Sequence, residues 1–203
     1  EFSAVNQIFD ISSLNIEVIR VNPRVSQSGH VYRYSDSDLQ KLRLLDLKML
    51  IRKGSGILRG DILDLCEHGI LSFHHGDNDV NRGGPAGFWE VYNQEKATGF
   101  IIQSLTEELD GGDILLKASL PTRPFYALNY SYLHEKSTPF LHKTIEKVLT
   151  ATAPIEVYPK RPYAHSLYRT PSLGVQIKYL FQTFVLFFQK LCRKVLSSQS
   201  SWG

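Results

Sequence analysis

The chain has 203 residues, of which 42% are hydrophobic and 21% charged, so it can bury the core of one domain and is not generally disordered. The net charge of +3 hides an asymmetry. Residues 151–203 carry seven basic side chains and one acidic, a balance of +6, while residues 1–150 carry a balance of −3. A mildly acidic body with a basic tail argues against a nucleic-acid binder, whose positive charge would follow a whole binding face.

The first part of the chain predicts strands separated by a helix. Residues 16–21 (IEVIRV) are rich in β-branched side chains and precede Asn-Pro, which favours a strand. The apolar run 44–52 predicts a buried strand, residues 62–68 predict a helix that Gly69 ends, and residues 70–74 (ILSFH) predict a second strand. This order over residues 44–74 is the spacing of a βαβ unit, whose strands pair in parallel.

The middle of the chain predicts further elements of an α/β domain. Residues 75–87 form a glycine-rich loop that we expect to be too polar for the core. Residues 88–94 predict a helix, and residues 98–105 and 113–120 predict two strands around a turn. Residues 137–150 predict a helix that begins with Ser137 or Thr138 as its cap.

The C-terminal part predicts one amphipathic helix that starts after Pro171-Ser172. Apolar residues recur there at steps of three and four, which is typical of one helix face. They are Leu173, Ile177, Leu180, Phe181, Phe184, Phe187, Phe188, Leu191 and Val195. Two interpretations stay open: a helix packed on the domain or on a second copy in a homo-oligomer, or an interfacial helix that makes peripheral contact with a membrane.

The setting of the protein follows from what the sequence lacks. Cys66 and Cys192 are far apart and without a Cys/His metal spacing, which excludes a disulfide-rich or zinc-finger framework. We identify no cleavable signal, and the apolar run Phe184 to Phe188 is far shorter than the ~18 residues that a membrane span needs. We therefore expect a cytoplasmic protein, soluble or peripheral.

Polar groups gather where the predicted strands end. His74 ends one strand, and Asp110 lies in a carboxylate-rich glycine turn before another. Functional groups of open α/β sheets meet at the carboxyl ends of the strands. A carboxylate that orients an imidazole forms a general-base pair, so these two residues are candidates for acid–base catalysis.

The spacing of several short motifs resembles that of the formyltransferase family. The matching pieces are Gly56-Ile57-Leu58, Gly69-Ile-Leu-Ser-Phe-His74, Arg82-Gly83, Thr98-Gly99 and Leu109-Asp110-Gly111-Gly112-Asp113. Each piece is weak alone, but together they cover residues 44–122 and are specific. The resemblance implies an open Rossmann-like α/β fold with a mostly parallel sheet of the formyltransferase type. To this the chain adds its C-terminal amphipathic helical tail. We divide it into a formyltransferase-like domain at 1–150 and a basic aromatic extension at 151–203.

The resemblance also implies site residues. His74 matches the family's catalytic histidine and Asp110 its essential aspartate, while Ser72 stands where the family has an asparagine. The implied donor is 10-formyltetrahydrofolate. Its expected contacts are Ile57, Leu58, Glu107, Glu108, Leu109 and Gly111.

The implied reaction is transfer of the formyl group to a primary amine. His74 would stabilise the developing oxyanion or relay a proton, and Asp110 would hold His74. A serine is too short to replace the asparagine, so we expect Asn78, Asn81 or His75 to compensate. The acidic body argues against a transfer-RNA acceptor and favours an amino sugar or sugar nucleotide.

The sequence raises two further hypotheses, a catalytically silent module and a metal site. The Ser72 substitution and the short stretch before Gly54, which lacks part of the family's opening βαβ unit, keep open a catalytically silent binding or regulatory module. A metal site at His75, Asp77 and Asp79 is disfavoured, because acidic residues cluster in turns for backbone reasons and the family uses no metal.

Overall fold

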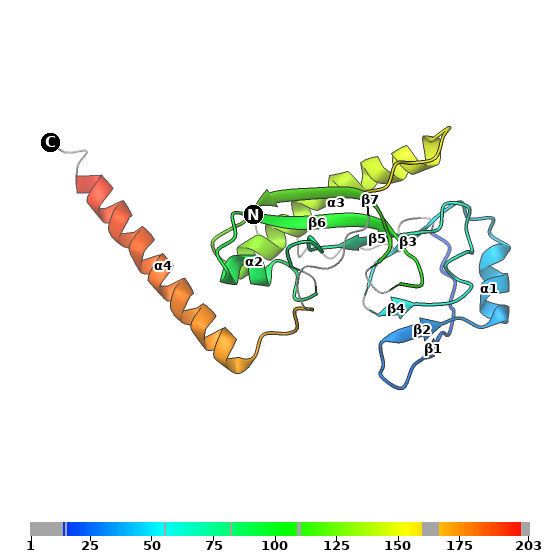
Figure 1. Cartoon of the computed structure of the whole chain (residues 1–203), viewed down its shortest axis with the longest axis horizontal. Helices are drawn as coiled ribbons and strands as arrows, with labels where there is room; N and C mark the ends of the chain where they lie inside the picture. Colours follow the sequence, from blue (N-terminus) through cyan, green and yellow to red (C-terminus); the bar gives the residue numbers. More distant parts are fainter. Residues whose placement is uncertain are drawn as a thin grey trace.

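The computed structural model describes residues 14, 16–54, 56–81, 83–108, 111–159 and 167–199. Its elements are, in chain order, β1 (Arg24–Val25), β2 (Val31–Arg33), α1 (Asp36–Arg43), β3 (Leu50–Arg52), β4 (Ile57–Leu58), β5 (Ile70–His74), α2 (Phe88–Tyr92), β6 (Ala97–Ser104), β7 (Asp113–Pro121), α3 (Tyr126–Thr150) and α4 (Leu173–Gln199). They form a small sheet in the order β1-β2-β4 and a larger sheet in the order β3-β5-β6-β7. The small sheet and α1 lie at one end of the molecule, and α4 projects from the other (Figure 1).

The larger sheet confirms the α/β class. Strand β5 has the predicted bounds and pairs in parallel with β3, as expected of the two strands of a βαβ unit. The expectation of a mostly parallel sheet needs correction, because the described pairs β5–β6 and β6–β7 are antiparallel. Strands joined by a short turn, as β6 and β7 are, pair in this way.

The N-terminal strand predictions were only partly correct. Residues 16–21 form no strand, and Ile16 and Val18 are 54% and 72% exposed. Only Leu50–Arg52 of the run 44–52 is a strand, and Leu44 is exposed. Apolar β-branched residues favour extended backbone, but a strand also needs a partner to accept its hydrogen bonds.

The connection between β3 and β5 is a series of turns rather than the predicted helix. The Leu63 N–H donates to the carbonyl of Gly60 at 2.9 Å, and Gly69 has the left-handed backbone expected of it, with φ 64°. The connection nevertheless contributes to the core, where Ile62 and Leu63 pack with Leu39 and Ile70. The apolar pattern was therefore predicted correctly and the backbone was not.

Helix α3 begins at Tyr126 rather than at Ser137, so Pro139 lies inside it, on its exposed side. Asn129 explains the earlier start. It is only 1% exposed, and its side-chain amide donates to the carbonyl of Gly87 at 3.0 Å. Asparagine is a weak helix former, but buried hydrogen bonds outweigh that propensity.

A pair of histidines joins the end of β5 to α3. The His75 and His134 rings lie 3.9 Å apart, and Ser137 Oγ is 3.2 Å from His75 Nε2. Burial, assisted by the neighbouring His134 and His74, lowers the pKa of His75 to about 3. His75 is therefore neutral in the folded protein and faces α3.

This burial makes the stability of the fold depend on pH. The unfolded chain protonates His75 near pH 6.5 and the folded chain only near pH 3, so the free energy of unfolding falls as the pH falls through that window. We expect a loss of about 1.4 kcal/mol between pH 7.5 and pH 5.5 from this group. Urea unfolding at both pH values measures it. The variant His75→Gln should lose this contribution, whereas the exposed-site control His142→Gln should keep it. Equal pH dependence in wild type and His75→Gln would contradict the assignment.

Candidate active site

His74 is the last residue of β5, and Ser72 lies two positions before it on the same side of the strand. Ser72 is 3% exposed and stands between Arg52 on β3 and Gln103 on β6 in the sheet register. Because opposite residues of paired strands point to the same side, these polar groups form a row across the sheet that leads up to His74.

The loop after β5 folds back over the sheet. A Cβ atom on Gly76 would stand 3.1 Å from His74 Nε2 and 3.0 Å from the carbonyl oxygen of Asn81. A Cβ on Gly99 would collide with Asp77. Glycine at these two positions lets the loop pass directly over His74 and β6.

Lys117 on β7 fixes this loop. Its ammonium group lies 2.8 Å from Asp77 Oδ1 and 2.5 Å from Asp79 Oδ2. Burial lowers the pKa of Lys117, but the two carboxylates outweigh burial and raise it. Our sequence reasoning missed Lys117, and its only sequence signal is a lone cation in the apolar run of β7. The two aspartates considered as metal ligands are thus paired with a lysine.

The loop was expected to be too polar for the core, and this was wrong at two positions. Asn78 and Asn81 are each 6% exposed. Asn81 lies close to Glu90 of α2, whose pKa is raised by burial. The third compensating residue we considered, His75, contacts α3 instead. His75 therefore has a structural partner of its own.

The segments expected to contact the folate are adjacent. Ile57 and Leu58 form β4, and the following Gly60 N–H donates to Glu107 Oε1 at 2.6 Å. Arg59 pairs with the other oxygen of Glu107 at 2.9 Å. These two groups hold the pKa of Glu107 below its usual range.

The rest of the carboxylate-rich turn is described in part. Glu108 is exposed, Gly111 is buried, and the Gly111 N–H donates to the Glu108 carbonyl at 3.3 Å. Leu109 and Asp110 lie outside the described residues. A contact between His74 and Asp110 therefore stays a prediction.

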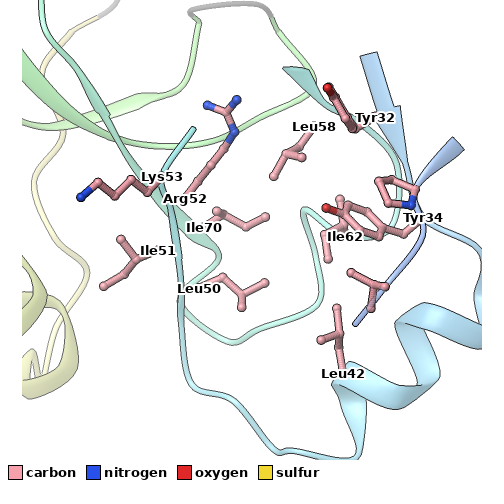
Figure 2. A pocket seen from close by; sticks show the side chains of 12 residues that line it. Tyr32, Tyr34, Leu42, Leu50, Ile51, Arg52, Lys53, Leu58, Ile62 and Ile70 are labelled. Carbon is pink, nitrogen blue, oxygen red and sulfur yellow. The ribbon is translucent and has the colours of Figure 1, made fainter. Parts of the chain in front are cut away.

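A cavity of about 360 Å³ lies between β3 and the small sheet. Leu50 and Arg52 point toward Tyr32 and Tyr34 across it, while Ile51 and Lys53 alternate to the other side of β3 (Figure 2). Arg52 also donates to the carbonyl of Gly56. The remaining lining residues are Val21, Pro23, Leu42, Leu58, Ile62 and Ile70. Among the expected folate contacts that the structure describes, Leu58 alone lines this cavity. The sequence did not predict the cavity itself.

Comparison with known proteins finds partial sequence matches to formyltransferases. The chain is 35% identical over 83 residues to a methionyl-tRNA formyltransferase of Caldanaerobacter subterraneus subsp. tengcongensis, covering 40% of this chain and 27% of that protein. Its identity to the Moorella thermoacetica methionyl-tRNA formyltransferase is 31% over 119 residues, covering 57% of this chain and 38% of that protein. No family model matches.

The solved structures agree with the sequence matches. The formyltransferase PseJ of Anoxybacillus kamchatkensis shares the fold with a TM-score of 0.53 at 18% identity, covering 68% of this chain and 71% of that one. The chain is thus similar in sequence to methionyl-tRNA formyltransferases and similar in fold to the formyltransferase PseJ. It spans 27% and 38% of the length of the two sequence relatives.

The close approach at Gly76 gives a second test. Gly76→Ala should destabilise the protein by about 1 to 3 kcal/mol, because the added methyl group displaces His74 or Asn81. Gly84→Ala is the matched control in the same loop, since nothing lies within 4 Å of its Cβ position. Urea unfolding of both variants measures the difference. A Gly76→Ala protein as stable as Gly84→Ala would show that the loop does not lie over His74.

Proposed function

We propose that the chain catalyses transfer of a formyl group from 10-formyltetrahydrofolate to a primary amine of a small molecule. The observation that carries this proposal is the place of His74. It ends β5 in a fold of the formyltransferase type, beneath a loop that Lys117 holds in place. That position lets one imidazole reach both reactants at the sheet edge.

The residues present fit the folate donor. Leu58 and Ile70 offer an apolar wall, the rings of Tyr32 and Tyr34 face them across a cavity of about 360 Å³, and Arg52 adds a cation. The ring faces of a folate can pack on such aromatic and apolar side chains, its carboxylate tail can pair with the cation, and the volume lies within the usual range for ligand pockets. Arg52 is also the register neighbour of Ser72, so the cavity borders the polar row that leads to His74.

When bound, the donor supplies an activated formyl group: its carbon bonds to the amine nitrogen, its bond to the folate nitrogen breaks, and that nitrogen gains the proton lost by the amine. In this proposal His74 carries the proton between the two nitrogens, and Asp110 orients the imidazole. The loop over His74 excludes water from the reacting groups.

Ser72 cannot supply the carboxamide that the family uses, because its hydroxyl is short and donates to the carbonyl of Phe73 at 3.3 Å. We assign that task to Asn78, which is buried in the loop over His74.

A small amine is the favoured acceptor. PseJ is described in complex with UDP-4,6-dideoxy-4-formamido-L-AltNAc and tetrahydrofolate, which supports an amino sugar or sugar nucleotide. Residues 1–150 carry a balance of −3, which disfavours transfer RNA. The thiols Cys66 and Cys192 are both free, which supports a cytoplasmic setting.

A catalytically silent binding module is the second candidate. It is favoured by the Ser72 hydroxyl, which is directed to the backbone and not to a substrate. Calorimetry with a folate analogue, together with turnover assays over a panel of amines, separates the two. Folate binding without turnover of any amine would support the silent module.

His74 is the decisive position for the enzyme. His74→Ala should abolish formyl transfer and leave the melting temperature within a few degrees, because the ring acts on substrates at the end of a strand. His30→Ala, in the exposed hairpin before β2, is the control and should keep full activity. Activity that survives His74→Ala, or a collapse in stability, would count against the catalytic role.

The assignment of Asn78 makes a separate prediction. Asn78→Ala should lower kcat by ~10² to 10³, the usual effect of losing one oxyanion contact, and Asn93→Ala at the exposed end of α2 should not. Ser72→Asn should lower activity through crowding. If Ser72→Asn instead raises activity, the enzyme is a slow one that lacks the carboxamide, and the role of Asn78 is wrong.

A further inference from the structure

Helix α4 exposes an apolar face along most of its length. Six side chains define what we call the apolar stripe: Ile177, Leu180, Phe181, Phe184, Phe187 and Phe188. They are between 57% and 68% exposed. The helix itself projects away from both sheets (Figure 1). Exposed apolar surface of this extent is unusual on a soluble protein and marks an interaction site.

The body of the protein holds α4 by its other side. Tyr179 Oη accepts a hydrogen bond from the Tyr126 N–H at 3.0 Å, and its ring lies 5.4 Å from that of Phe88. Lys178 lies 5.4 Å above the ring of Tyr92. At 100° per residue, Tyr179 stands on the side of the helix away from the apolar stripe. Docked in this way, α4 directs the stripe outward, where none of the residues that the structure describes covers it.

The charges of α4 indicate the kind of partner. The sequence of Leu173–Gln199 contains Lys178, Lys190, Arg193 and Lys194 and no acidic residue. Two copies packed stripe to stripe would cover the stripes but leave the cations of both helices without a countercharge. An anionic surface provides the complementary charge.

The composition of the helix, rather than its length, distinguishes lying on a membrane from crossing it. The 27 residues of α4 extend about 40 Å as a helix. None of the helices in the described part of the chain is, however, both long and apolar enough to span a bilayer. A sequence that combines a phenylalanine stripe on one face with basic residues on the polar face is the composition of helices that lie in the membrane interface.

We propose that α4 binds an anionic phospholipid surface, with the apolar stripe inserted at the boundary of headgroups and acyl chains and the basic residues that follow Phe188 attracted to lipid phosphates or carboxylates. This surface lies beyond the edge of the sheet that carries His74, and the inference is independent of formyl transfer.

Vesicle co-sedimentation of the full chain tests the proposal. Wild type should bind vesicles of phosphatidylcholine with phosphatidylserine, bind pure phosphatidylcholine much more weakly, and dissociate as the salt concentration rises. The double variant Phe184→Ser with Phe188→Ser should reduce partitioning ~100-fold. Lys190→Gln with Lys194→Gln should reduce it ~20-fold on anionic vesicles. The control Gln182→Ser with Gln189→Ser, off the stripe, should leave binding unchanged.

Three results would overturn the proposal. The first is that wild type does not bind anionic vesicles. The second is that the phenylalanine double variant binds them as well as wild type does. The third is that this variant changes from dimer to monomer in sedimentation while its lipid binding stays unchanged. The last result would assign the stripe to self-association. Circular dichroism and thermal melting of each variant check that the fold is intact, which we expect because the replaced side chains are exposed.

Discussion

The ion pairs of Lys117 with Asp77 and Asp79 determine the arrangement of the candidate site. They join β7 to the loop that leaves β5, across the intervening strand β6. Without them, a loop that contains three charged or amide side chains in a row would favour solvent over the surface of a sheet. Because the pairs hold it there, Asn78 and Asn81 become buried and His74 is covered. The half-buried Lys117 thus positions the loop after β5, and this loop, rather than Lys117 itself, lies next to His74.

The cavity borders the polar row of Arg52, Ser72 and Gln103 at β3. Arg52 belongs to both, since it lines the cavity and stands opposite Ser72 in the register. Leu58 connects the cavity to β4, and the next residues of the chain bind Glu107 through Arg59 and Gly60. Two sheets of different size therefore line one cavity, and the short parallel pairing of β2 with β4 brings the two tyrosines to it.

The sequence predicted those features that depend on local pattern. The bounds of β5 and the existence of β6, β7, α2 and α4 follow from periodicity and turn residues. The selection of His74 and Ser72 from motif spacing stays a prediction. The failures have one cause, which is dependence on distant partners. Residues 16–21 lack a strand to pair with, α3 starts early because of Asn129, and Lys117 acquires its role from aspartates 38 and 40 residues earlier in the chain. The cavity escaped prediction for the same reason, since Tyr32 and Tyr34 reach it through strand pairing that no local pattern encodes.

The side chain of Asn129 has a consequence for the way the domain opens. Its amide connects the N-terminal turn of α3 to Gly87 before α2 and to Thr98 at the start of β6, and its oxygen accepts from the Arg123 N–H at 2.8 Å. Three segments that meet in one buried carboxamide cannot separate one at a time without leaving polar atoms unsatisfied. They therefore form a single cooperative unit, and the backbone amides of α2, the start of β6 and the first turns of α3 should exchange with deuterium through one shared opening event.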